Sequence, residues 1–130
     1  MSHFSTVKTE LRDRQALVDA LSDLGHAPAP APQDVRGYQG QTIRADIAIP
    51  QPHGADIGFR LNSSNGSYEL VTDLQLWNQP IPIERFLAQL HQRYALRTIL
   101  SATADEGFQV STQEEKNDGS IELVVTRWDG

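Results

Sequence analysis

Alternating apolar and polar residues dominate the centre of the chain, from residue 33 to residue 74. Neighbouring side chains of a β-strand point to opposite faces, so this period of two predicts half-buried strands. Turns rich in glycine, proline and asparagine separate the strands, which predicts a meander with one apolar side. The predicted strands are residues 33–38, 42–49, 57–61 and 68–74.

The predicted strand 42–49 shows the alternation most clearly. We expect its apolar residues to share one face of the sheet and its polar residues to share the other, because a strand changes face at every residue. The apolar set is Ile43, Ala45, Ile47 and Ile49, and the polar set is Thr42, Arg44 and Asp46.

Apolar residues recur with helical spacing on either side of this central region. Leucines and alanines between residues 17 and 24 follow Asp13, a favourable N-cap, and precede Gly25, a favourable helix stop. They predict a helix of about three turns. A second helix is predicted to begin at Pro82, and its apolar stripe changes phase near residues 93–95. The change of phase predicts a bend in the helix, or an apolar stripe that shifts gradually around the helix axis.

Strands are also predicted at both ends of the chain. They cover residues 2–11, 108–113 and 120–128, and the last two are joined around the turn 117–119. The resulting order, β-α-β-β-β-β-α-β-β, predicts an α+β fold with a single mostly antiparallel sheet and two helices packed on one face. The opposite face is expected to meet solvent or a partner. We expect residues 1–130 to form a single domain.

Length, charge and cysteine content exclude several classes of function. The chain has 130 residues, a net charge of -6 and no cysteine. Without cysteine it cannot itself form disulfides, thiolate zinc sites or cysteine-ligated iron–sulfur clusters. The negative charge argues against nucleic-acid binding, which needs a positive field. No apolar run approaches the roughly 20 residues that cross a bilayer, and no secretory signal opens the chain, so we expect a cytoplasmic protein without a membrane span.

The residue types that carry catalysis are scattered along the chain. The four histidines are isolated and form no metal-ligand pair by their spacing. The glycine-containing segment 36–40 lies between predicted strands, where a tight turn explains it better than phosphate binding at a helix N-terminus. The serines between residues 63 and 67 have no base at a fixed spacing. The sequence therefore predicts no catalytic residue, no metal site and no cofactor.

Charged residues on the polar side of the central strands form the remaining candidate site. Nine of the eleven basic residues are arginine, which suits carboxylates and protein interfaces. One interpretation is a solvated sheet face with cross-strand ion pairs, which also involves Asp56 and Glu69. The other is a polar pocket or docking surface with aromatic anchors. The candidate binding residues are Arg36, Tyr38, Arg44, Asp46, Arg60, Tyr68, Asp73 and Trp77.

Several sequence blocks in fixed order resemble one family almost from end to end. The blocks are residues 1–9, 35–41, 45–47, 56–60, 68–73, 92–95 and 121–128. They resemble the uncharacterised cyanobacterial and algal-plastid family called hypothetical chloroplast reading frame thirty-five. The alanine–proline stretch 26–32 departs from the family pattern. The resemblance implies a photosynthetic bacterium, a plastid lineage or a phage of such a host, and it implies no established reaction.

The resemblance also implies an accessory or adaptor role, because members of such families often occur with genes for small ferredoxin-like proteins and AAA-type ATPases. We therefore expect a non-enzymatic protein that binds another protein in a cyanobacterial cytosol, with a ferredoxin-like protein or an AAA-type ATPase as the conjectured partner. The alternative is a small-ligand or anion-binding domain, or a weak enzyme, and a third reading is a homo-oligomer formed through an edge strand. The small-ligand alternative uses Arg36, Arg44, Arg60 and Tyr68 around a pocket.

Overall fold

A computed structural model of the chain describes residues 4–105, 108–115 and 121–127, with side chains described for residues 4–103. The predicted turn 117–119 and the ends of the terminal strands, residues 2–3 and 128, lie outside the described residues. The described elements are β1 (Phe4–Lys8), α1 (Arg14–Asp23), β2 (Gln33–Arg36), β3 (Thr42–Ala45), β4 (Ile47–Ile49), β5 (Ile57–Asn62), β6 (Ser67–Asp73), α2 (Ile83–Asp105), β7 (Phe108–Glu115) and β8 (Ile121–Arg127). Short 3-10 turns cover Tyr38–Gly40 and Leu74–Leu76.

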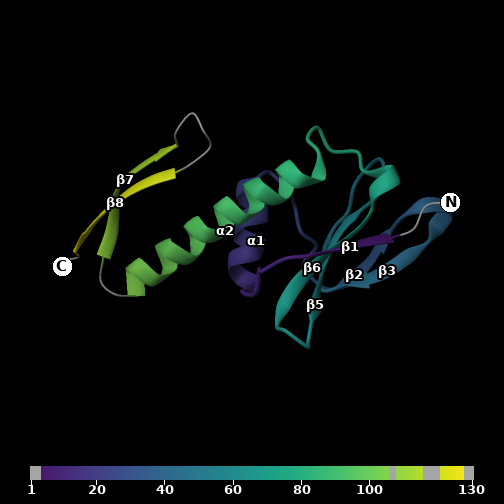
Figure 1. Cartoon of the computed structure of the whole chain (residues 1–130), viewed down its shortest axis with the longest axis horizontal. Coiled ribbons are helices and arrows are strands. Elements are labelled where there is room, and N and C mark those ends of the chain that lie inside the picture. The colour runs from purple at the N-terminus through teal and green to yellow at the C-terminus, as the bar shows by residue number, and fades with distance from the viewer. Residues whose placement is uncertain (1–3, 106–107, 116–120, 128–130) are drawn as a thin grey trace.

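The α+β class and the predicted element order are confirmed. The described strands form one four-stranded antiparallel sheet in the order β1-β6-β5-β4 and two separate hairpins, β2–β3 and β7–β8. In Figure 1 the sheet and the hairpin β2–β3 occupy one end of the molecule, and α2 leads to the hairpin β7–β8 at the other end. The first strand of the chain therefore pairs with β6, which lies more than sixty residues later, as Ser5 opposite Thr72 illustrates.

The predicted strand 42–49 is divided into β3 and β4 at Asp46. At this point the chain leaves the hairpin β2–β3 and enters the four-stranded sheet. Ala45 consequently packs in a different apolar cluster from Ile47 and Ile49, so the expectation that they share one face is wrong. The periodicity was the same on both sides of Asp46, but a bend at this residue turns the two halves toward different layers.

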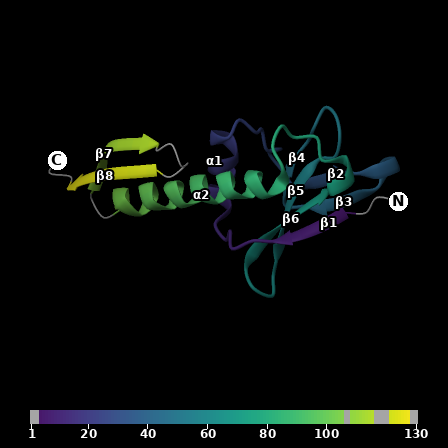
Figure 2. The same cartoon turned by 45° about the horizontal axis from the view of Figure 1, so that its top comes forward.

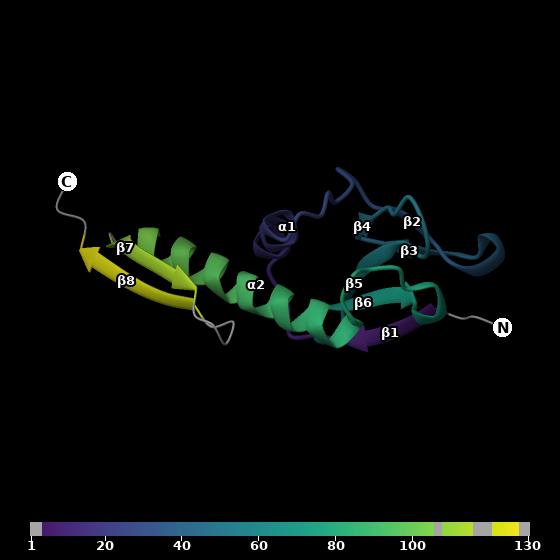
Figure 3. The ribbon, with the colours of Figure 1, turned by 90° about the horizontal axis from the view of Figure 1, so that it is seen from above.

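Two apolar clusters lie on the two faces of the four-stranded sheet. The larger one joins the sheet to α1 and α2 and includes Phe59, Leu70 and Phe86. The smaller one joins the sheet to the hairpin β2–β3 and includes Val35 and Val71. In Figure 3 the helices lie on one side of the sheet and the hairpin β2–β3 lies on the other. The expectation that the second face meets solvent or a partner is therefore wrong for its central part, because the hairpin covers it.

Helix α2 is continuous through residues 93–95, so the change of phase in its apolar stripe does not interrupt the helix. Phe86 and Leu90 are buried in the cluster shared with α1 and the sheet. Leu96, on a different side of the helix, is also buried, and β7 packs against α2. Figures 1 and 2 place β7–β8 beside the C-terminal part of this helix. Ile99 remains 47% exposed.

Candidate functional site

Arg36 and Asp56 form the most heavily bonded charged pair among the described residues. The carboxylate of Asp56 accepts from the Arg36 backbone N, Nε and Nη2 at 2.8, 2.9 and 2.9 Å. It also accepts from the backbone N of Gln51 at 2.8 Å. In return, the backbone N of Asp56 donates to the carbonyl of Arg36 at 3.0 Å. Asp56 is thus a structural bridge between the hairpin β2–β3, the segment after β4 and the start of β5.

The protonation behaviour of this pair follows from its contacts. Burial raises the pKa of Asp56, but the hydrogen bonds from Arg36 and Gln51 outweigh it and leave the pKa below its ordinary value. The hydrogen bonds between the two side chains, together with the negative charge of Asp56, raise the pKa of Arg36. A carboxylate that stays ionised and has accepted four N–H groups is poorly suited to act as a general base.

Asp73 fixes the tip of the same hairpin. Its side chain is fully buried, and it accepts from the backbone N of Tyr38 and of Gln75, each at 3.2 Å. Gly37 lies between Arg36, which Asp56 binds, and Tyr38, which Asp73 binds. It packs against the ring of Phe4, and a Cβ atom at this position would stand 2.9 Å from Cζ of that ring. A side chain at position 37 would therefore require the ring of Phe4 to shift. Asp56 and Asp73 together hold the hairpin against the sheet.

The remaining charged candidates are also engaged within the chain. Asp46 accepts from the backbone N of Leu61 at 2.7 Å, which satisfies a β5 amide at the point where the neighbouring strand leaves the sheet. Arg60 forms the expected cross-strand ion pair with Glu69 at 3.7 Å. On the exposed side of the hairpin, Arg44 lies 3.8 Å from Asp34. These pairs agree with the interpretation of the charged residues as a network of cross-strand contacts.

Tyr68 and Trp77 lie on the helix side of the sheet rather than among these charges. Tyr68 is buried in the larger apolar cluster, 5% exposed. Trp77 packs edge-on against Phe86, with ring centroids 5.4 Å apart, and its Nε1 donates to the carbonyl of Ile81 at 2.9 Å. The structure therefore does not bring the eight candidate residues together in one pocket. It brings Arg36, Tyr38 and Asp73 to the hairpin β2–β3, and it separates them from Tyr68 by the sheet.

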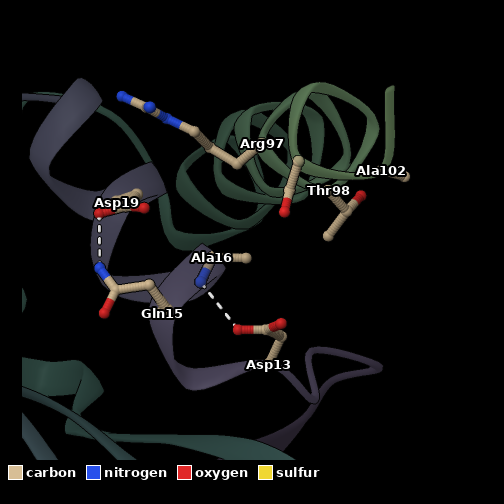
Figure 4. Close-up of a pocket in the computed structure, with 8 residues that line it drawn as sticks. Asp13, Gln15, Ala16, Asp19, Arg97, Thr98 and Ala102 are labelled. Atoms are coloured by element: carbon tan, nitrogen blue, oxygen red, sulfur yellow. Dashed lines mark hydrogen bonds between the residues drawn. The ribbon is translucent and has the colours of Figure 1, made fainter. Parts of the chain in front are cut away.

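A groove of about 250 Å³ lies between α1 and α2 (Figure 4). One wall comes from the beginning of α1, and the other comes from the fourth to sixth turns of α2. Its lining combines two alanines with carboxylate, hydroxyl, amide and guanidinium groups. The lining residues are Asp13, Gln15, Ala16 and Asp19 on one wall, and Arg97, Thr98, Ser101 and Ala102 on the other.

Two polar contacts hold the walls of this groove at a fixed separation. The hydroxyl oxygen of Tyr94 accepts from the backbone N of Arg12 at 3.1 Å and of Asp13 at 2.9 Å. Farther along α1, Arg97 donates through Nε and Nη2 to the two carboxylate oxygens of Asp23 at 2.8 and 2.5 Å. These hydrogen bonds lower the pKa of Asp23, more than burial raises it, and they raise the pKa of Arg97. The pair is therefore ionised at neutral pH.

In each of the two carboxylates that line the groove, one oxygen atom accepts a hydrogen bond. Oδ1 of Asp13 accepts from the backbone N of Ala16 at 3.0 Å, which confirms Asp13 as the N-cap of α1. Oδ1 of Asp19 accepts from Nε2 of Gln15 at 2.9 Å. Among the hydrogen bonds of the described residues, the Oδ2 atoms of both aspartates accept none. The sequence predicted the cap but not the groove, because the second wall lies about eighty residues away in the chain. The position of Arg97, at helical spacing from Leu90 and Tyr94, could have indicated that it lies on the same side of α2 as the buried residues.

No three histidine, aspartate or glutamate side chains gather to hold a metal ion within the part of the chain that the structure describes. Over the same residues, no helix has both the length and the apolar character needed to cross a membrane.

Comparison with known proteins gives the family. Residues 20–124 match the model of a family described as "Protein of unknown function (DUF1257)". The chain belongs to this family. It is also 43% identical to the "Uncharacterized protein ycf35" of Guillardia theta and 41% identical to that of Cyanophora paradoxa, in each case over 128 residues and 98% of both chains. The family expected from the sequence blocks is confirmed. No solved structure matches the chain.

Proposed function

We propose that this member of the DUF1257 family is a non-enzymatic accessory protein that binds another protein in the cytosol of photosynthetic cells. The observation that carries the proposal is the groove between α1 and α2. Its volume of about 250 Å³ is below the roughly 300–1,000 Å³ of typical small-molecule sites. A groove of this size accepts one or two side chains of a partner more readily than a cofactor.

The internal use of the other charged residues supports the same conclusion. Asp56 and Asp73 are buried acceptors for backbone amides, and Asp46 completes the hydrogen bonding of β5. These groups stabilise the fold and are not presented to a substrate. The resemblance to plastid proteins agrees with an accessory role in photosynthetic or redox-complex maintenance.

Affinity purification from a photosynthetic host, at native abundance and under mild conditions, tests the proposal. We expect one protein to be enriched with the tagged chain and absent from an untagged strain. The purified partner is then recombined with the purified chain, and a saturable 1:1 complex is expected by light scattering. If nothing is enriched, or if the chain alone accounts for the complete mass of the complex, the proposal of a heterologous partner is wrong.

A further inference from the structure

The four-stranded sheet ends at β4 on one side and at β1 on the other. Of the strands that the structure describes, only β6 pairs with β1, and Figure 3 shows β1 at the outer border of the sheet. The backbone groups of an edge strand that point away from its sheet can pair with another strand. The two edges of this sheet differ in whether those groups are used.

The alternation of the backbone identifies the groups of β1 that point outward. A residue of an antiparallel strand directs its N–H and its C=O to the same neighbour, and the next residue directs both to the opposite side. The N–H of Tyr68 donates to the carbonyl of Leu11 at 2.7 Å, on the side of β1, so Leu70 faces β1 as well. Its register partner Val7 therefore faces β6. The outward N–H and C=O groups belong to the alternate positions Phe4, Thr6 and Lys8.

These outward groups have no hydrogen-bond partner within the described part of the chain. Thr6 and Lys8 are exposed, and the register with β6 runs through the strand without interruption. Proline, a β-bulge or several charged residues would protect an edge, but β1 carries only Lys8 at its end. This edge can therefore extend the sheet.

The opposite edge is closed. Strand β4 has three residues, and the carbonyl of its middle residue, Ala48, accepts from the backbone N of Ala29 at 2.8 Å. Ala29 lies in the alanine–proline stretch 26–32, whose prolines have no N–H for a further strand. The described hairpins are protected too, because β2–β3 carries exposed charged residues and the ladder of β7–β8 has a register shift next to Val110. Among the described edges, β1 has the least protection.

We propose that β1 pairs with β1 of a second copy of this chain, so that two four-stranded sheets join across a two-fold axis. A symmetric interface requires a self-complementary surface, and β1 meets this requirement. With Thr6 opposite Thr6 of the second copy, Phe4 of each copy lies opposite Lys8 of the other, and the outward N–H and C=O groups of all three residues are paired. No like charges meet, because Lys8 is the one charged residue of β1 and its two copies lie at opposite ends.

The size of this contact determines the strength of the dimer. Five residues on each side are far fewer than the roughly 20–30 of a standard stable interface. We expect reversible association, with a dissociation constant in the micromolar range or above. The inference is independent of the proposed function, because a dimer can still bind another protein.

Sedimentation velocity of the native chain over a concentration series tests the pairing. We expect the mass to rise from 14.4 kDa towards twice that value as the concentration increases. Thr6→Lys places like charges face to face at the two-fold axis and should weaken the dimer by roughly tenfold or more. The variant also reduces the net charge of -6, so a weaker dimer cannot result from general repulsion. Because Thr6 is exposed, we expect the monomer to keep its fold, and a thermal unfolding curve verifies this.

A charge-swapped pair makes the test specific to the two-fold register. Thr6→Glu alone should also dimerise more weakly than the native chain. An equimolar mixture of Thr6→Lys and Thr6→Glu should recover the dimer, because opposite charges then meet across the two strands. Thr42→Lys is the matched control: it adds the same charge at an exposed threonine of β3 and should leave dimerisation nearly unchanged.

A native chain that stays monomeric at every concentration would overturn the inference. So would an unweakened dimer in Thr6→Lys, equal weakening in Thr6→Lys and Thr42→Lys, or a mixture of the two Thr6 variants that does not dimerise. Thr6→Pro removes the outward N–H and identifies a different occupant. If the native chain is monomeric and Thr6→Pro no longer enriches a partner from the host, β1 receives a strand of that partner, and the second copy is ruled out.

Discussion

Arg36 and Asp56 bind each other through both side chain and backbone: three N–H groups of Arg36 donate to the Asp56 carboxylate, and the Asp56 N–H donates to the Arg36 carbonyl. Replacement of Asp56 by alanine leaves the partly buried backbone amides of Arg36 and Gln51 without their acceptor. We expect Asp56→Ala to lower the free energy of unfolding by about 2–3 kcal/mol, measured by urea denaturation. Asp34→Ala, at an exposed and loosely paired position, is the control and should change it little. An equal effect of both variants would contradict the bridging role.

The same pair predicts how stability depends on pH. The pKa of Asp56 is below 3.8 in the folded chain, so its ionised form stabilises the fold fully above pH 3.8. As the pH falls through the folded-state pKa, this contribution is lost. The difference in unfolding free energy between the native chain and Asp56→Asn should therefore shrink below pH 3.8. A difference that stays constant across this range would show that ionisation of Asp56 is not involved.

His26 also makes the fold less stable as the pH falls, but in a higher pH range than Asp56. Its ring meets Phe86 edge-on, with centroids 5.4 Å apart, and burial lowers its pKa from 6.5. The folded chain then binds fewer protons than the unfolded chain as the pH falls below 6.5, so stability decreases in that window. We expect His26→Gln to flatten the pH dependence between neutrality and the folded-state pKa, with His91→Gln at an exposed position as the control. An unchanged slope in His26→Gln would contradict this assignment.

The hydroxyl group of Tyr94 links the two helices, and its removal should weaken their contact. Its hydroxyl accepts from two backbone amides at the start of α1, and Tyr94→Phe removes that acceptor while keeping the ring. We expect a loss of about 1 kcal/mol in unfolding free energy and faster hydrogen exchange at the amides of Arg12 and Asp13. Tyr38→Phe is the matched control, because Asp73 binds the backbone of Tyr38 and not its hydroxyl. Unchanged exchange in Tyr94→Phe would contradict the predicted contact.

The lack of a side chain at Gly58 allows the hairpin β2–β3 to lie close to the sheet. A Cβ atom at this position would stand 2.9 Å from Cβ of Ala45 and 3.0 Å from Cγ1 of Val35. Gly58→Ala should therefore push the hairpin away and cost about 1–3 kcal/mol of unfolding free energy. The double variant Gly58→Ala/Ala45→Gly removes the closest contact and should recover part of the loss. If the second substitution adds its own full cost instead, the two residues are not in contact.

The elements were predictable because each depends on neighbouring residues. Alternation in 57–61 and 68–74 marks β5 and β6, and the cap at Asp13 and the stop at Gly25 delimit α1. The cross-strand pair of Arg60 with Glu69 was also within reach, since a short turn sets the register of the two strands. The groove could not be predicted, because Asp13 and Ser101 line one surface only after α2 docks on α1.

Local pattern by itself determined which segments form strands and helices, the α+β class and the family, because these are recorded in the spacing of side chains along one segment. Only the tertiary structure decided what covers each face. A polar residue such as Asp56 or Asp73 has the same place in the alternation whether its strand meets water or another layer. The outcome depends on the bend at Asp46, which returns the hairpin β2–β3 to the sheet and turns an expected solvated face into a buried set of hydrogen bonds.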